Sequence, residues 1–160
     1  GRVVMLSSLG HKLAPASGID FDNLDGSKWY KDWSFYGQSK LANLLTAVVL
    51  SKQLKGTNAT ANAVNPGMIK TNPSRKMTGL QAMLINNPES RWMLRRLKDS
   101  TSISEGAATQ CYAATAAELA DVSGRYFTDS NEARPSKLSQ DQALAIRLWN
   151  YSIKKLEQYL

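Results

Sequence analysis

Tyr36 and Lys40 are residues whose types and spacing could do chemistry. A separation of four residues places two side chains on one face of a helix, one turn apart. A free phenol, with a pKa of about 10, is a poor acid or base at neutral pH, whereas an adjacent ammonium favours the phenolate. The pair could therefore move a proton to or from a substrate.

The same spacing recurs at Tyr151 and Lys155, so it does not identify a site by itself. An isolated pair of this kind is more often a solvated helix face. Tyr36 differs in its context, because Ser8 ends a short apolar run and the helix that bears Tyr36 comes next along the chain. Ligands of open α/β sheets bind at the carboxyl ends of the strands, so we expect Ser8 and Tyr36 to meet at one crevice.

The elements around these residues predict a parallel crossover unit. Residues 3–6 are apolar at every position, which is typical of a strand buried on both faces. Residues 10–34 lack a sustained period and predict a long loop with at most short helical turns. Residues 35–54 predict a helix, and residues 59–64 a second strand that ends at Asn65-Pro66-Gly67. The loop after that strand would reach the same sheet edge as Ser8.

The rest of the chain predicts one irregular segment and two more helices around a third strand. Residues 68–101 suggest two short helices in a lid over the substrate. Ser102-Ile103-Ser104-Glu105 has capping-box spacing and opens a helix to about Leu119. Residues 124–128 predict the third strand, and Ser139-Gln140-Asp141-Gln142 a second box that opens the final helix. This order is half of a doubly wound, Rossmann-like parallel α/β sheet with three strands and flanking helices.

Composition narrows the class of protein further. A chain of 160 residues with 42% hydrophobic content fits one globular domain. Its net charge of +7 is compatible with binding to nucleic acid, to an anionic membrane surface or to a phosphate-bearing cofactor. The charge alone does not distinguish among these partners. The single cysteine, Cys111, cannot form an internal disulfide, which favours a reducing, intracellular location.

Three further features have an ordinary structural interpretation. We expect His11 to serve loop structure rather than a metal site, and Cys111 to be a buried thiol without a role. Residues 75–98 interleave six cations with apolar side chains, as a basic amphipathic segment does. A solvated lid is the first interpretation of that segment, with contact to a membrane surface and binding of nucleic acid as alternatives.

The sequence resembles the short-chain dehydrogenase/reductase family, and within it the retinol-dehydrogenase-like and WW-domain-oxidoreductase-like members. The resemblance runs nearly end to end. Residues 3–8 match the serine strand of the family, residues 36–43 its active-site helix, and residues 65–71 its Pro-Gly loop. Residues 105–108, and residues 124–127 leading to Pro135-Ser136, give weaker support.

The resemblance implies an NAD(P)-dependent oxidoreductase of small lipophilic alcohols, aldehydes or ketones. Tyr36 would exchange a proton with the substrate oxygen while a hydride moves between the nicotinamide ring and the carbon that bears this oxygen. Ser8 would position and polarise the oxygen, and Lys40 would assist Tyr36 and bind the nicotinamide ribose. The implied cofactor-binding residues are Tyr36, Lys40, Pro66, Gly67, Ile69 and Thr71. Either NADP or NAD fits, no metal or nucleic acid is implied, and a homo-oligomer stays open.

Two features of the family have no counterpart in the sequence. No Gly-x-Gly occurs in the 160 residues, so the glycine-rich phosphate loop is missing, as is an asparagine of an earlier helix. We therefore expect residues 1–160 to be the C-terminal catalytic and substrate-binding part of a single Rossmann domain, inactive in isolation. Membrane association would then come from a segment outside the chain, and residues 3–8 would form an exposed apolar edge. The alternative is a non-catalytic, truncated binding or regulatory protein.

Overall fold

The computed structural model describes residues 1–67 and 102–159, which fall into two compact units. Residues 1–66 and 108–159 belong to the first unit, which contains the sheet, and residues 67–107 belong to the second. The short helices and lid predicted for residues 68–101 lie outside the described residues, as do Ile69, Thr71 and the basic segment.

The sheet of the first unit confirms the predicted α/β class. Its strands are β1 (Arg2–Leu6), β2 (Thr60–Asn65), β3 (Tyr126–Thr128) and β4 (Asn131–Glu132), in that spatial order. The first three are parallel, with Val4 beside Asn62 and Val64 beside Phe127. The sequence did not predict β4, which is antiparallel to β3 and only two residues long.

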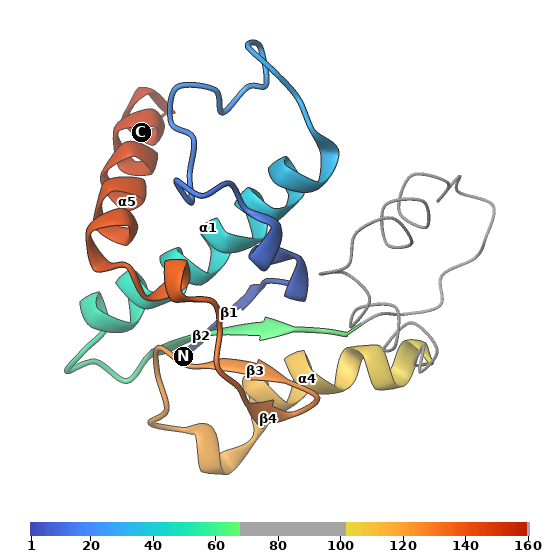
Figure 1. Ribbon diagram of the computed structural model, residues 1–160. Coiled ribbons are helices and arrows are strands. Elements are labelled where there is room, and N and C mark those ends of the chain that lie inside the picture. Colours follow the sequence, from blue (N-terminus) through green and yellow to red (C-terminus); the bar gives the residue numbers. More distant parts are fainter. Residues whose placement is uncertain (68–101, 160) are drawn as a thin grey trace. The chain divides into compact units, whose positions relative to one another are not determined.

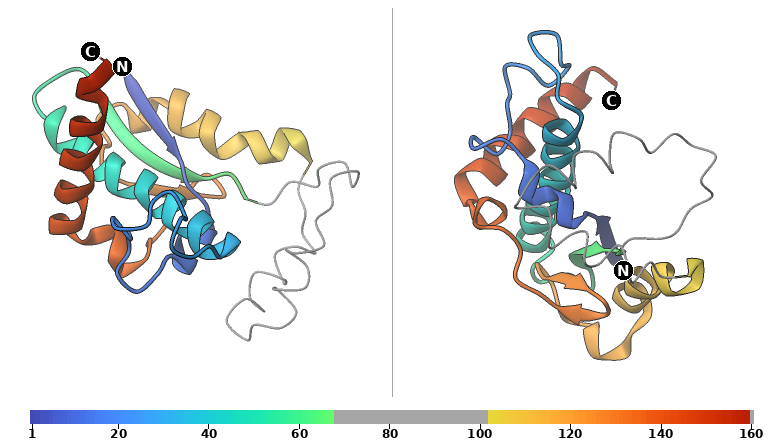
Figure 2. Two further views of the ribbon diagram at one scale, coloured as in Figure 1. Left: turned by 90° about the horizontal axis from the view of Figure 1, so that it is seen from above. Right: turned by 45° about the vertical axis from the view of Figure 1, so that its right-hand side comes forward.

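Helices cover both faces of this sheet. On one side lie α1 (Asp32–Gln53) and α5 (Gln142–Leu156), and on the other lie residues 108–115, which belong to α4 (Ile103–Thr115) (Figures 1 and 2). Buried side chains of α1 such as Leu41 and Leu45 pack against α5, because apolar residues three and four apart share one helix face. None of the helices in the described residues has the length and apolar character needed to cross a membrane.

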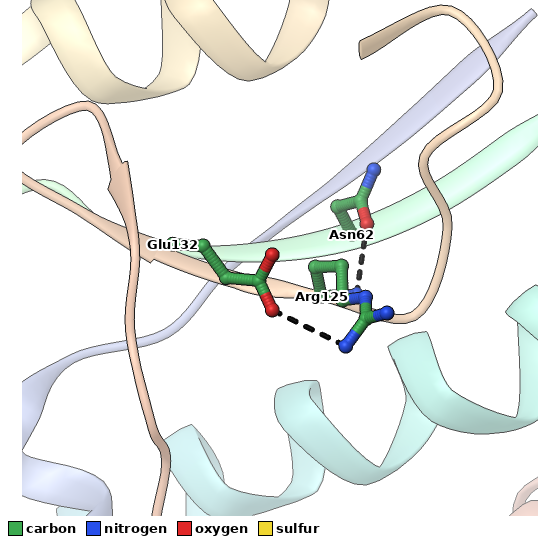
Figure 3. A network of polar contacts seen from close by, with 3 residues as sticks. All are labelled: Asn62, Arg125 and Glu132. Carbon is green, nitrogen blue, oxygen red and sulfur yellow. Dashed lines mark hydrogen bonds and ion pairs between the residues drawn. The ribbon is translucent and has the colours of Figure 1, made fainter.

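The hairpin between β3 and β4 turns on Asp129 and Ser130, whose φ angles are 51° and 57°. Two consecutive left-handed residues make a type I′ turn, which suits the twist of a two-residue hairpin. Arg125, just before β3, pairs with Glu132 of β4 at 3.2 Å, and its backbone N–H donates to the side chain of buried Asn62 at 2.9 Å (Figure 3). The side-chain amide of Asn62 therefore holds the backbone of the residue that precedes β3.

The two predicted capping boxes have different outcomes. Glu105 accepts a hydrogen bond from the backbone of Ser102 at 2.7 Å, which confirms the first box, although α4 ends at Thr115 rather than near Leu119. The second box is wrong in its cap: Asp141 caps α5 by accepting from the backbone of Leu144 at 3.0 Å. Ser139 instead belongs to the preceding 3₁₀ turn, Lys137–Gln140, and is buried there.

Cys111 is exposed, contrary to the expected buried thiol. Thr109 and Ala113 are the buried residues of this part of α4. A residue midway between two positions on the sheet-facing side of a helix points away from the sheet. The alanine-rich composition therefore identified the helix but not the face on which its cysteine lies.

Candidate active site

Ser8 lies two residues beyond the end of β1 and is the N-cap of the 3₁₀ turn η1 (Leu9–Leu13). Its backbone is extended, and its Oγ accepts a hydrogen bond from the N–H of Gly10 at 3.1 Å. Because this bond uses an oxygen lone pair, the hydroxyl proton of Ser8 stays able to donate to another group. The Ser8 side chain thus stabilises the turn that follows it, and its hydroxyl is still able to donate a hydrogen bond near the carboxyl end of the strand.

The Tyr36 ring packs against the backbone of Gly10. A methyl group on Gly10 would lie 2.5 Å from Cε1 of Tyr36 and 3.4 Å from Oγ of Ser8. Only glycine leaves room for this approach, so the structure brings Tyr36 and Ser8 together around one small residue. Tyr36 is 39% exposed, which leaves its side chain accessible to a ligand.

Gly37 makes a second close approach between α1 and η1. A methyl group on Gly37 would lie 2.5 Å from the Ala14 nitrogen and from the Leu13 carbonyl carbon. The backbone of the helix therefore rests directly on the backbone of the turn that follows Ser8. This contact fixes where the first turns of α1, and with them Tyr36, lie relative to Ser8.

Side chains of α1, together with that of Ser7, tie the helix to the end of β1. Lys40 Nζ lies 5.6 Å from the centre of the Tyr36 ring and donates to the Leu6 oxygen at 3.5 Å. Asn43 Nδ2 donates to the same oxygen at 2.7 Å, and the hydroxyl of Ser7 donates to the Lys40 oxygen at 2.8 Å. Sequence reasoning gave Asn43 no separate function, although it stands three residues after Lys40 on the same helix.

Tyr151 and Lys155 provide an internal comparison. Lys155 Nζ lies 5.8 Å from the centre of the Tyr151 ring, close to the separation found for Lys40 and Tyr36. Tyr151, however, packs edge-on against Phe21 at 5.6 Å between ring centres. The spacing therefore produces the same local pair twice, and the contact with the Ser8 turn distinguishes Tyr36.

His11 connects the Ser8 turn to the C-terminal part of the chain. Its Nδ1 lies 2.6 Å from the Ser8 oxygen, and its Nε2 accepts from the Ser136 N–H at 3.0 Å. Because that N–H can only donate, the imidazole is neutral and carries its proton on Nδ1. Burial lowers the pKa of His11, in keeping with this neutral form. The expected role of His11 in loop structure is confirmed, although its distant partner gave no sequence signal.

The other predicted site residues follow β2. Pro66 comes directly after this strand, which is parallel to β1, so the two strands end at the same edge of the sheet. At that edge the buried Asn65 donates to Oγ1 of Thr128 at 3.0 Å. Gly67, in the second unit, has a φ of 79°, a left-handed conformation that favours glycine.

Known proteins resemble this chain over nearly its whole length. It is 42% identical over 159 residues to the short-chain dehydrogenase TIC 32 A, chloroplastic, of Brassica napus, covering 98% of the chain and 47% of that protein. It is 38% identical to retinol dehydrogenase 12 of Mus musculus (97% and 45% covered) and 36% identical to human retinol dehydrogenase 14 (94% and 43%). The chain belongs to the short-chain dehydrogenase/reductase family. No protein-family model matches it.

The chain thus spans about half the length of the curated short-chain dehydrogenases that it matches. A crystal structure of an uncharacterized protein from Mycobacterium paratuberculosis superposes with a TM-score of 0.65, over 96% of this chain and 49% of that one. At 24% identity the likeness concerns the fold, which agrees with a partial Rossmann-like sheet. The family resemblance inferred from the three sequence segments is therefore confirmed.

Proposed function

We propose that the chain carries the proton-transfer machinery of an NAD(P)-dependent oxidoreductase, with Ser8, Tyr36 and Lys40 as its catalytic residues. The observation that carries this proposal is the packing of the Tyr36 ring against Gly10, beside Ser8 Oγ and with Lys40 Nζ 5.6 Å from the centre of the ring. Membership of the short-chain dehydrogenase/reductase family supports the same reaction class.

Each side chain has a separate task in this proposal. The Tyr36 hydroxyl gives a proton to the substrate oxygen during reduction and takes it back during oxidation. The Ser8 hydroxyl donates to the same oxygen, since its hydrogen bond with Gly10 uses only a lone pair. The Lys40 ammonium stabilises negative charge on the Tyr36 oxygen. The bound dinucleotide supplies or accepts the hydride.

The donor groups of the site fit the nicotinamide end of such a cofactor. An ammonium has three N–H groups, and the Leu6 oxygen takes one from Lys40, which leaves donors for ribose hydroxyls. Tyr36, Pro66 and Gly67 would complete this end together with Ile69 and Thr71. The sequence contains no Gly-x-Gly, so we assign no residue to the pyrophosphate or adenosine, and both NADP and NAD are compatible with the proposal.

We propose a small lipophilic alcohol, aldehyde or ketone as the substrate. Several of the similar proteins are named retinol dehydrogenases, which supports a lipophilic alcohol in particular. The reducing location inferred from the single cysteine supports an intracellular protein. Residues 75–98 stay the proposed substrate lid, with membrane-surface contact as the alternative function of that segment.

Phenylalanine substitutions at the two tyrosines test the catalytic assignment. Tyr36→Phe in the full-length protein removes only the transferable proton, so turnover should fall by roughly 10²- to 10⁴-fold while cofactor affinity stays nearly constant. Tyr151→Phe is the matched control and should retain activity, because the Tyr151 ring packs on Phe21. Steady-state kinetics and a cofactor titration of both variants provide the readout.

Other outcomes of this experiment would point elsewhere. Retained turnover in Tyr36→Phe, or equal losses in the two variants, would remove Tyr36 from the catalytic role. Cofactor binding without turnover of any alcohol, aldehyde or ketone in the unmodified protein would favour the non-catalytic alternative. The absence of a phosphate loop from these 160 residues is the observation that keeps this second candidate open.

A further inference from the structure

Ser8 is held on two sides by groups of the turn that follows it. Its carbonyl oxygen faces both the backbone N–H of His11, at 3.0 Å, and the His11 ring nitrogen Nδ1, at 2.6 Å. Its side-chain oxygen accepts from the N–H of Gly10. The carbonyl contacts fix the orientation of the peptide that follows Ser8, and the Gly10 contact fixes the direction of its hydroxyl. The His11 imidazole therefore helps to fix the backbone carbonyl of Ser8, a proposed catalytic residue.

The same imidazole is anchored at a distance. Its Nε2 accepts from the backbone of Ser136, and its ring meets Tyr126 of β3 edge-on at 5.6 Å. His11 is 1% exposed, so water does not compete for these contacts and a substrate cannot reach the ring. A neutral imidazole with its proton on Nδ1 donates from Nδ1 to the Ser8 oxygen and accepts at Nε2 from the Ser136 N–H.

We infer that His11 is a positioning residue: it anchors the Ser8 turn to the segment that contains Ser136, and thereby sets the direction in which the Ser8 hydroxyl points. The expected effect of His11 on kcat rests on the proposed function. Its effect on the orientation of the Ser8 turn does not. Lys12 of η1 is the charged neighbour that acts on the imidazole, and its charge opposes protonation of the ring. Burial is the largest cause and lowers the pKa of His11, the charge of Lys12 lowers it further, and the hydrogen bond with the Ser8 oxygen opposes them in part.

Three variants at His11 separate positioning from simple filling of space. His11→Ala in the full-length protein should lower kcat by about 10- to 100-fold, the range expected when a catalytic group shifts by about 1 Å. His11→Asn should recover much of that loss, because an amide nitrogen can take the place of Nδ1 and donate to the Ser8 oxygen. His11→Gln should recover less, because its amide lies further along the side chain. Equal activity in all three variants would overturn the inference.

A double-substitution cycle tests whether His11 acts through Ser8. If it does, adding His11→Ala to Ser8→Ala should cause little further loss of kcat, whereas independent residues would multiply their losses. Ser136→Pro tests the hydrogen bond between His11 and Ser136 by changing the residue that donates it. Ser136 has a φ of −66°, which proline adopts, and the substitution removes the N–H that donates to His11. Lys137→Ala, on the exposed neighbour, is the control and should leave kcat unchanged.

Hydrogen exchange provides a readout that does not depend on turnover. The Gly10 N–H bonds to Ser8 Oγ, so its protection should fall in His11→Ala and Ser136→Pro and stay high in His11→Asn and Lys137→Ala. Unchanged Gly10 protection in both disrupted variants, or independent losses in the cycle, would refute the inference. If instead protection falls as expected but Ser8→Ala and Tyr36→Phe keep full turnover, the positioning is correct and the proposed function is wrong.

Discussion

Gly10 decides whether Tyr36 can reach Ser8. We expect Gly10→Ala to lower turnover strongly while the protein stays folded, because the added methyl group would meet the end of a partly exposed tyrosine ring that can move away. The moved ring would no longer lie beside Ser8. Steady-state kinetics of the full-length variant, with circular dichroism to verify folding, measure both effects. Normal turnover in Gly10→Ala would show that Tyr36 does not work from this position.

Gly37→Ala is the matched comparison for Gly10→Ala. Its methyl group would meet backbone atoms of Leu13 and Ala14, which cannot move without displacing the turn. Overpacking of this kind costs roughly 1 to 3 kcal/mol. Urea unfolding should therefore show a larger loss of stability for Gly37→Ala than for Gly10→Ala. The opposite order would show that α1 and η1 are less tightly apposed than the structure indicates.

The lowered pKa of His11 predicts a pH dependence of stability. The folded state disfavours protonation of His11, whereas the unfolded chain binds a proton at the ordinary pKa of 6.5. Above that pH both states are neutral and the full stability is present, so the free energy of unfolding should decrease as the pH falls below 6.5. The slope for one proton is at most about 1.4 kcal/mol per pH unit. Urea unfolding between pH 7.5 and 5 measures it.

His11→Asn is the control for this titration, since an amide does not titrate in this range. Its stability should vary less with pH than that of the unmodified protein, and the difference between the two curves isolates His11 from carboxylates such as Asp25 and Glu105. Parallel curves would show that His11 does not govern the acid-side loss. The importance of His11 could not be predicted from sequence, because Ser136 stands 125 residues away.

At the scale of elements, sequence predicts well where a local pattern decides the structure. The helix around Leu41 and Leu45 has an apolar face and is present, although it begins three residues earlier than predicted, at Asp32. Strand β4 was missed because two exposed residues carry no pattern of alternation. Ser139 had the spacing of a cap, but its hydroxyl donates to the Ser136 oxygen three residues earlier, in the 3₁₀ turn that precedes α5. Patterns within one element were thus predictable, and pairings between distant elements were not.

The β3–β4 turn predicts a stabilising substitution. Ser130 adopts a φ of 57°, which strains an L-residue but not glycine. Ser130→Gly should therefore raise the free energy of unfolding by up to about 1 kcal/mol. The hydrogen bond that the backbone N–H of residue 130 donates to Oγ1 of Thr109 would be kept. Denaturant unfolding measures the change. Asn131→Gly, in the strand beside it, is the control and should lower stability.

At the scale of the whole molecule, β1 lies at the edge of the sheet within the described residues, and its Val3 and Leu6 side chains are 37% and 48% exposed. This arrangement agrees with the predicted exposed apolar edge, but the prediction of a strand buried on both faces is wrong, because no residue of β1 is buried. The proposed function assigns residues only to the nicotinamide end of the cofactor. Titration of the 160-residue chain with NAD(P)H should therefore show no saturation in the micromolar range, whereas a chain extended at its N-terminus by a glycine-rich phosphate loop should saturate. Micromolar binding by the 160 residues alone would show that they contain a complete cofactor site.

The link between His11 and Ser136 also concerns the order in which the protein is made. Ser8, Tyr36 and Lys40 are synthesised well before Ser136, because the anchor of the Ser8 turn is 125 residues downstream of His11. At about 5 to 20 residues per second, synthesis separates the two by roughly 6 to 25 seconds. During that interval the nascent chain holds the residues of the site without the contact that orients them. A premature stop between β3 and Ser136 would therefore release a protein that keeps the proposed catalytic residues but lacks the anchor of the Ser8 turn.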